Sequence, residues 1–322
     1  MMLNIDGVQG PSRWPKVRAR VESVVADALG EVPKERTELQ LKTIDELQFG
    51  GYVRRRVNYF VDPWERVTAW LFIPDGREEF PAILCCHRAN ALGKDECAGI
   101  DGDPFLAFAQ RYVEKGFVTL APDCITAGSR VSSGLAPFDT ENFYKDNPKM
   151  SAMGKMLADH MHAVDALAEI KRVDAARIGV IGHDLGAQNA LLLAAFDERI
   201  QACVASCGFT RFSDDKDPGR WARDTGFVYL PKLRKAMHDR KFPFDWEHIL
   251  ALVAPSPTLL QTALNDPCFP KTRSCGKAVE LAREVYNLLG APEAIENIRH
   301  SEGHRMTVEG LEAADDWFDR WL

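Results

Sequence analysis

An acidic side chain lies between two apolar runs, in the segment Gly182-His183-Asp184-Leu185-Gly186. The run before it, RIGVIG, is typical of a buried strand, and the run after it, LGAQNALLLAAF, is typical of a helix. In the motif G-x-S-x-G, such a strand-to-helix turn projects its central residue above a sheet, and the glycines allow backbones to approach closely. A lone G-x-D-x-G is usually an ordinary loop. The flanking pattern, however, predicts that Asp184 is a reactive carboxylate where that motif has serine.

An acid and a histidine follow in the order that this motif requires. Asp266 ends the strand-like run PTLLQTALND, and His304 follows the run AIENIRH ahead of a final helix. Taken singly, Asp266 would more often be a turn residue before proline, and His304 an ordinary loop histidine. Both lie at the carboxyl ends of predicted strands, the edge at which open α/β sheets bind ligands. We therefore predict a catalytic set of Asp184, Asp266 and His304.

A fourth element is the segment His87-Arg88-Ala89-Asn90, which follows the strand-like run PAILCC. We expect an oxyanion hole formed by the backbone N–H groups of Arg88 and Leu185. The side chains of His87 and Arg88 are candidates for substrate binding. The Arg88 side chain has an alternative role as a surface residue or as a partner of Asp95 or Glu96, and the sequence leaves that choice open.

Strand and helix patterns alternate along most of the chain, which predicts an α/β fold with a doubly wound, mostly parallel sheet. The runs YVRRRVNYFV and RVTAWLFIP predict an antiparallel hairpin around Asp62-Pro63. We divide the chain into an N-terminal helical extension, residues 1–50, and one α/β domain, residues 51–322. The extension contains one helix, with Ser12 as N-cap and Gly30 as its end.

The alternation lapses between about Thr210 and Pro257, where charges, aromatic residues and prolines mix without a strand pattern. We interpret residues 210–257 as a lid-like insertion over the carboxyl edge of the sheet. Its aromatic residues should cover a pocket above Asp184. Trp221 and Tyr229 are therefore candidates for substrate binding, although a lid tyrosine is more often part of the packing.

Composition excludes several functional classes. The 322 residues are 46% hydrophobic and 27% charged, with a net charge of -7 and no long run of one sign. These values argue against binding to nucleic acid or to a membrane, and no segment has the roughly 18 apolar residues of a spanning helix. The eight cysteines include no C-x-x-C pair and are expected to be free thiols. We expect a cytoplasmic enzyme for a small-molecule substrate, without a cofactor or metal, and leave open whether it is a homo-oligomer.

Several segments together resemble the dienelactone-hydrolase-like and acetylxylan-esterase-like branch of the α/β hydrolases. They are GGYVRRRVNYFVDPWERVTAWLFIP, the CHRAN loop with GKDE after it, RIGVIGHDLGAQNALLLAAFDERI, the NDPCFP segment and the EGHRM ending. The resemblance covers roughly residue 50 to the end and implies the α/β-hydrolase fold with a triad at Asp184, Asp266 and His304. That branch has serine or cysteine where this chain has Asp184. The string GHDxGA is instead similar to haloalkane dehalogenases, fluoroacetate dehalogenases and epoxide hydrolases, which use an aspartate nucleophile.

An aspartate at this position changes the chemistry of the first step. A carboxylate gains little by attacking an ester, whereas attack on an sp3 carbon that carries a halide or epoxide oxygen gives a covalent alkyl ester. His304, oriented by Asp266, would then activate water to hydrolyse that ester. Details depart from the family patterns, since Leu185 stands where haloalkane dehalogenases have tryptophan. Two alternatives remain open at this point: Asp184 as a general base in an enzyme descended from an esterase, and a non-catalytic binding protein.

Overall fold

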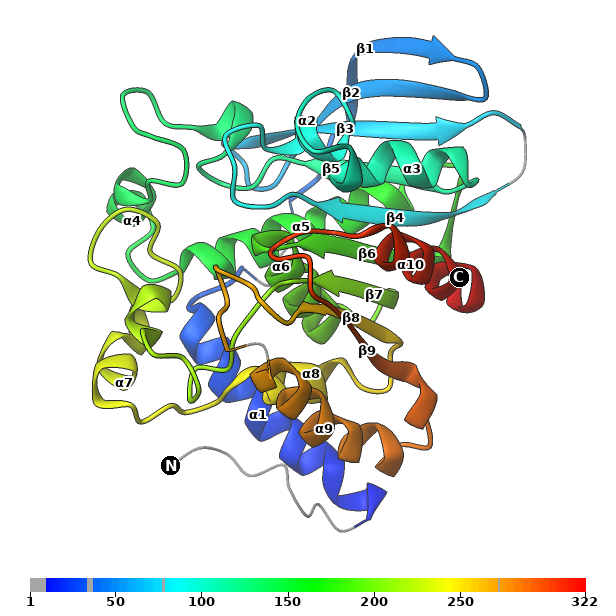
Figure 1. The fold of residues 1–322 in the computed structure, drawn as a ribbon. Helices are drawn as coiled ribbons and strands as arrows, with labels where there is room; N and C mark the ends of the chain where they lie inside the picture. Colours follow the sequence, from blue (N-terminus) through cyan, green and yellow to red (C-terminus); the bar gives the residue numbers. More distant parts are fainter. Residues whose placement is uncertain (1–9, 34–36, 77–78, 272) are drawn as a thin grey trace.

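One nine-stranded sheet runs through the molecule in the order β1-β2-β3-β5-β4-β6-β7-β8-β9 (Figure 1). The structure is a computed structural model that describes residues 10–33, 37–76, 79–271 and 273–322. The strands are β1 (Lys42–Phe49), β2 (Tyr52–Phe60), β3 (Arg66–Pro74), β4 (Phe80–Cys86), β5 (Val118–Pro122), β6 (Val173–His183), β7 (Ile200–Ser206), β8 (Thr258–Ala263) and β9 (Ile295–His300). The first three strands are an antiparallel meander, and the other six are mutually parallel.

Helices cover both faces of the sheet. One face carries α3 (Phe108–Glu114) and α10 (Val308–Trp321), whose aromatic residues form a shared apolar cluster with the strands. The other face carries α5 (Ala152–Ala168) and α6 (Leu185–Phe196), with α8 (Trp246–Val253) and α9 (Arg273–Leu288) beside them. The helix α6 is buried along nearly its whole length, which explains its almost uniformly apolar sequence. The predicted doubly wound α/β fold is confirmed.

The start of the chain differs from the predicted helical extension. The α-helix α1 begins at Trp14 and ends at Leu29, so Ser12 lies in a preceding 3-10 turn and is not the N-cap. Gly30 ends α1 as predicted. Residues 42–49 form the edge strand β1, although no strand was expected before the hairpin. Almost every side chain of β1 is exposed, so its sequence lacks the apolar alternation by which strands are recognised.

The predicted insertion separates into two parts. Its last part, α8, packs against α6 and α9 and belongs to the helical layer. We call residues 210–245 the lid segment; it holds two 3-10 turns and the short helix α7 (Arg234–Asp239). Asp245 joins both ends of this segment, because its carboxylate caps α8 and also accepts the backbone N–H groups of Phe212 and Ser213, at 2.7 and 2.9 Å.

The helix α1 packs beneath the lid segment and against α8. Val25 and Leu29 of α1 line a small apolar void of about 20 Å³ together with Trp221 and Leu230 of the lid segment. The N-terminal helix therefore supports the lid segment from the side that faces away from solvent.

Two further expectations concern the whole chain. Among the helices that the structure describes, none combines the length and apolarity needed to span a membrane. All eight cysteines are free thiols, seven of them buried, and Cys268 is exposed.

Candidate active site

Asp184 forms a strained elbow between β6 and α6. Its backbone has φ 55° and ψ -120°, in the left-handed half of the conformational map that non-glycine residues rarely adopt. The Asp184 N–H donates to the carbonyl of Ser206, 2.9 Å away, which fixes the turn. A Cβ atom on Gly182 would overlap the backbone of Gly186, and one on Gly186 would overlap the carbonyl of Cys86. Both glycines are thus required by close backbone approach, as the motif predicted.

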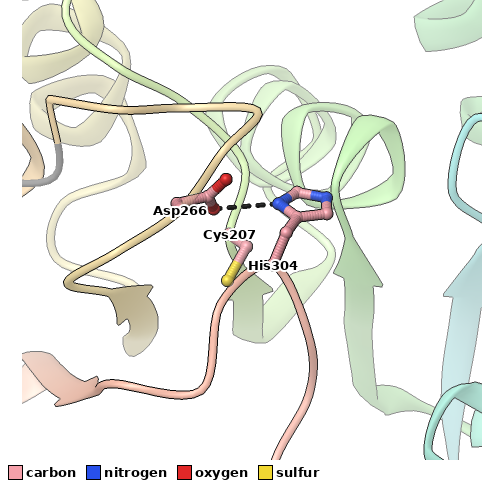
Figure 2. Close-up of side chains that lie close together, drawn as sticks. All are labelled: Cys207, Asp266 and His304. Carbon is pink, nitrogen blue, oxygen red and sulfur yellow. Dashed lines mark hydrogen bonds and ion pairs between the residues drawn. The ribbon is translucent and has the colours of Figure 1, made fainter.

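His304 lies between two carboxylates. Its Nδ1 is 2.8 Å from Asp266 Oδ2, a hydrogen bond visible in Figure 2, and its Nε2 is 3.6 Å from Asp184 Oδ1. Asp266 is held in turn by the N–H groups of Cys268 and Phe269, which donate to its Oδ1 at 2.7 and 2.9 Å. The predicted hydrogen bond between Asp266 and His304 is therefore present, and the three predicted residues form one connected group.

This arrangement shifts the pKa values of all three groups. Burial lowers the pKa of His304, but its contacts with Asp184 and Asp266 outweigh burial and raise that pKa to about 9. Burial opposes ionisation of Asp184 and Asp266, yet the contact with His304 outweighs it and holds both carboxyl pKa values below normal. At neutral pH the group is an imidazolium between two carboxylates. His304 can therefore act as a base only after Asp184 loses its negative charge and the ring releases its proton.

A second histidine, His183, packs against the ring of His304. The ring of His183 lies 4.7 Å from the ring of His304, and its Nδ1 lies 3.0 Å from Ser206 Oγ. Burial lowers the pKa of His183 to about 3, so this ring is neutral. His183 therefore packs under His304 without adding a competing charge.

The loop after β4 supplies a hydrogen bond to Asp184, but from a different residue than predicted. The N–H of Ala89 donates to Asp184 Oδ2 at 3.1 Å, whereas Arg88 was the predicted oxyanion-hole donor. Leu185, the other predicted donor, is the first residue of α6, so its N–H has no acceptor within the helix.

The side chains of Arg88 and His87 also differ from the prediction. The guanidinium of Arg88 is bidentate on the buried carboxylate of Glu96, at 2.9 and 2.7 Å, and does not line the cavity above Asp184. His87 is buried, with Nδ1 2.7 Å from the Arg88 carbonyl and Nε2 accepting the Cys124 N–H at 3.0 Å. Both residues brace the loop that presents Ala89, because buried polar groups need such partners.

A cavity of about 420 Å³ opens above Asp184. Its walls come from the sheet edge and from the lid segment, as predicted, and the candidates Trp221 and Tyr229 both line it. The full lining is Ala89, Phe138, Asp184, Gln188, Arg220, Trp221, Arg223, Phe227, Tyr229, Pro267, Cys268 and Phe269. Burial, with a smaller contribution from Asp184, raises the pKa of Tyr229, so its phenol keeps its proton and is able to donate a hydrogen bond to a bound molecule.

A slightly larger hollow of about 470 Å³ lies outside this centre, around Lys271, Arg273 and Lys277. Its lining includes none of the predicted catalytic residues. The cavity above Asp184 is therefore the candidate active site. Of the two hollows, only this one contains a carboxylate with a shifted pKa and several aromatic wall residues.

Two lid arginines line the catalytic cavity and were not predicted. Arg220 is held by Asp215, at 2.8 and 2.6 Å, and its guanidinium lies over the ring of Phe269. Arg223 is exposed and makes no ion pair with any residue that the structure describes. The only signal in the sequence was the segment DPGRWARDTGF, which mixes basic and aromatic residues at the middle of the predicted lid.

The elbow, the hydrogen-bonded acid and histidine, and the mostly parallel sheet define an α/β-hydrolase fold. Residues 67–222 match the dienelactone hydrolase family. The chain is 24% identical, over 95% of its length and 100% of the relative, to a Bacillus subtilis protein described as a candidate hydrolase, YtaP. It is also 25% identical to the esterase FrsA of an Enterobacter species, over 68% of this chain and 50% of that one.

Esterases are among the solved structures that resemble this fold. A candidate acetyl xylan esterase from Bacteroides fragilis superposes with a TM-score of 0.73 at 20% identity, covering 93% of this chain and 78% of the other. A glucuronoyl esterase from Solibacter usitatus gives 0.76 at 15% identity, covering 97% and 94%. The protein is thus a hydrolase similar to the dienelactone hydrolase family. These likenesses give no support to the similarity with dehalogenases and epoxide hydrolases that Asp184 indicates.

Proposed function

We propose that this hydrolase uses Asp184 as a nucleophile that displaces a leaving group from an sp3 carbon of a small organic substrate. The observation that carries the proposal is that the two carboxylate oxygens of Asp184 have different neighbours. Oδ2 accepts the N–H of Ala89, whereas Oδ1 lies toward His304 at the base of the cavity. A carboxylate held in this way is ionised and needs no base before it attacks, unlike a serine hydroxyl.

In the first step, Asp184 Oδ1 forms a bond to the substrate carbon. The bond from that carbon to a halide or an epoxide oxygen breaks, and the leaving atom takes the electron pair. Oδ2 becomes the carbonyl oxygen of the new ester and stays hydrogen-bonded to Ala89. The Tyr229 hydroxyl lines the same cavity and donates a hydrogen bond to the departing halide or oxygen.

The first step prepares His304 for the second. Alkylation removes the charge of Asp184, one of the two carboxylates that raise the pKa of His304, so the imidazolium releases a proton to the epoxide oxygen or to solvent. His304 then takes a proton from water, and the hydroxide adds to Cγ of Asp184. Ala89 and Leu185 N–H groups stabilise the oxyanion on Oδ2. The ester C–O bond breaks and the product oxygen takes the proton from His304. The carboxylic acid left at Asp184 then gives its proton to His304, which restores the carboxylate and the imidazolium.

The lid segment indicates which substrates this site prefers. Arg88 was expected to bind a substrate anion, but its guanidinium is occupied by Glu96. Arg223 instead brings a guanidinium to the cavity wall without an ion-pair partner among the described residues. A substrate with a carboxylate several bonds away from its reactive carbon would suit both Asp184 and Arg223. Asp184 would attack the carbon, and the Arg223 guanidinium would bind the carboxylate in a bidentate manner.

The test is a single turnover in ¹⁸O-labelled water, with enzyme in excess over a haloacid or epoxy acid. Water attacks Cγ of Asp184 in the proposed mechanism, so the first product carries unlabelled oxygen and the label appears in the Asp184 peptide. His304→Gln should react once and accumulate the alkyl ester, seen as an added mass on intact protein. Label in the first product, together with no adduct on His304→Gln, would overturn the proposal.

The second candidate is an esterase in which Asp184 and His304 together activate water, without a covalent intermediate. The likeness to esterases favours it, as does the direct approach of His304 Nε2 to Asp184 Oδ1 at 3.6 Å. It predicts rapid hydrolysis of small nitrophenyl esters by the native protein. The displacement mechanism predicts slow hydrolysis of these esters, and faster hydrolysis after Asp184→Ser, because the hole and the histidine already suit an acyl transfer.

A further inference from the structure

A thiol lies directly beside the pair formed by Asp266 and His304. Cys207 follows β7 and lies beside this pair, and in the view of Figure 2 its Sγ points away from the hydrogen bond between Asp266 and His304. One ligand atom from each of Cys207, Asp266 and His304 lies within 4.8 Å of the other two. The three residues come from three different loops at the carboxyl edge of the sheet, so no local sequence motif identifies the group.

The proposed reaction makes no use of Cys207. Its Sγ makes long contacts, 3.9 Å to the carbonyl of Arg305 and 3.9 Å to His300 Nε2. A buried thiol beside an imidazole and a carboxylate is a candidate metal ligand.

We propose that Cys207, Asp266 and His304 bind a thiophilic divalent cation, Zn²⁺ or Cd²⁺, and that this binding switches the hydrolase off. A thiolate, an imidazole and a carboxylate are the donor set that Zn²⁺ prefers, and a hard cation such as Mg²⁺ would be a poor match. The site shares Asp266 and His304 with the catalytic group, and the hydrolytic steps proposed above involve no metal. The inhibition rests on the proposed role of His304, whereas the binding does not.

The geometry needs only a local adjustment. Zn–N and Zn–O bonds of about 2.0 Å and a Zn–S bond of about 2.3 Å place ligand atoms roughly 3.3 to 3.8 Å apart. Cys207 Sγ must therefore turn toward the pair and approach by up to about 1 Å, while His304 Nδ1 and Asp266 Oδ2, now 2.8 Å apart, must separate by roughly 0.5 Å. The cation takes the place of the proton between His304 Nδ1 and Asp266 Oδ2, and the thiol proton of Cys207 also leaves to solvent.

His300 gives the cation both a fourth donor and a route of entry. Its Nε2 lies 3.9 Å from Cys207 Sγ, and its ring is half-buried close to the exposed Glu302. A cation arriving at His300 from solvent reaches the thiol without passing through the catalytic cavity.

Bound metal would stop the second step of the reaction. With Nδ1 bonded to the cation, His304 loses its hydrogen bond to Asp266 and its electrostatic support, so its Nε2 becomes a poor base. The first step at Asp184 does not need His304 as a base. Metal-treated protein should therefore still accept one substrate equivalent and then stall.

The experiment titrates chelator-treated full-length protein with Cd²⁺ and records the ultraviolet charge-transfer band of a Cd–thiolate bond. The wild type should give the band at one equivalent of metal. Zn²⁺ should compete for it and lower turnover at least tenfold, with recovery after addition of chelator. Cys207→Ser should retain its metal-free rate, lose the band and resist Zn²⁺, and His300→Gln should bind Cd²⁺ about tenfold more weakly.

Cys268→Ser is the matched control, because Cys268 is the exposed thiol nearest the site and lies in the catalytic cavity. It should keep the Cd²⁺ band and the inhibition relative to its own metal-free rate. A band that survives Cys207→Ser, or one that disappears in Cys268→Ser, would overturn the proposal, as would the absence of any band in the wild type. Cys207→Ala replaces Cys207→Ser if the serine variant does not fold.

Discussion

The two walls of the catalytic cavity are built in different ways. The sheet wall takes Ala89 and Asp184 from the turns after the parallel strands β4 and β6. His304 follows β9 and lies 3.6 Å from Asp184, although it is not a lining residue of the cavity. The lid wall takes Trp221, Arg223 and Tyr229 from a segment whose only α-helix is the six-residue α7. Backbone geometry therefore fixes the reacting groups to within hydrogen-bond distances, whereas the lid wall depends on side-chain packing. We therefore expect the sheet wall to carry out the reaction and the lid wall to select the substrate.

The largest expected effect removes the nucleophile from the sheet wall. Asp184→Asn keeps the shape of the side chain but removes its negative charge, and we expect kcat to fall by about 10⁴ or more. Tyr229→Phe, the matched change on the lid wall, should lower kcat by about tenfold or less, because it removes one hydrogen bond. Steady-state kinetics with intact-protein mass spectrometry measure both. Comparable losses for the two variants would contradict the division between the walls.

A glycine pair compares the rigidity of the two walls. Gly186→Ala forces a methyl group into the carbonyl of Cys86, and we expect it to lower the free energy of unfolding by about 2–4 kcal/mol. In the lid segment, a Cβ on Gly219 would meet only the Asp217 carboxylate, at an ordinary 3.4 Å. Gly219→Ala should therefore change stability by about 0.5 kcal/mol or less. Urea denaturation decides the comparison, and equal losses would show that the elbow is not the stiffer wall.

Substrate choice provides the third comparison. Arg223→Gln should raise KM about 10- to 30-fold for a substrate with a carboxylate and leave KM for its neutral amide unchanged, with kcat little altered. Arg234→Gln is the control, since Arg234 pairs with Asp224 and does not line the catalytic cavity. If both substrates respond equally to Arg223→Gln, the arginine shapes the lid segment and does not recognise charge.

The smallest expected effect concerns the proton on His304. Asp184→Asn removes one of the two carboxylates beside this ring, so its pKa should fall from about 9 toward the ordinary value of 6.5. A raised folded-state pKa stabilises the fold fully below pH 6.5, and that contribution is lost as the pH rises through about 9. Asp184→Asn should thus cost more stability at pH 6 than at pH 10. Histidine NMR titrations and pH-dependent urea unfolding measure the two shifts, and an unchanged pKa would contradict the ion pair.

The sheet wall was largely predictable, because strand-to-helix patterns locate the carboxyl ends of parallel strands. Asp184, Asp266 and His304 lie at such ends and are connected in the structure. The donor to Asp184 was misplaced by one residue, since a strand pattern does not say where the following loop turns. The pairing of Arg88 with Glu96 was one of two alternatives that local spacing left open.

The lid wall was predictable only as a region. Trp221 and Tyr229 line the cavity, but nothing in the sequence separated Arg223, which lines it without an ion-pair partner among the described residues, from Arg220, which Asp215 holds. That difference depends on tertiary packing across irregular backbone. The proposed metal-binding group was likewise not predictable from local sequence. Cys207, Asp266 and His304 lie together only because the strands that precede them are neighbours in the sheet.

The packing of α1 beneath the lid segment has a consequence for biosynthesis. The helix α1 leaves the ribosome early, but its partner α8 is made roughly 220 residues later, a delay of about 10 to 45 s at ordinary translation rates. During that interval, the apolar face with Val21, Val25 and Leu29 has no native surface to cover it from this side. The nascent chain therefore exposes an amphipathic helix during this interval, and that helix offers a binding site for chaperones until α8 emerges.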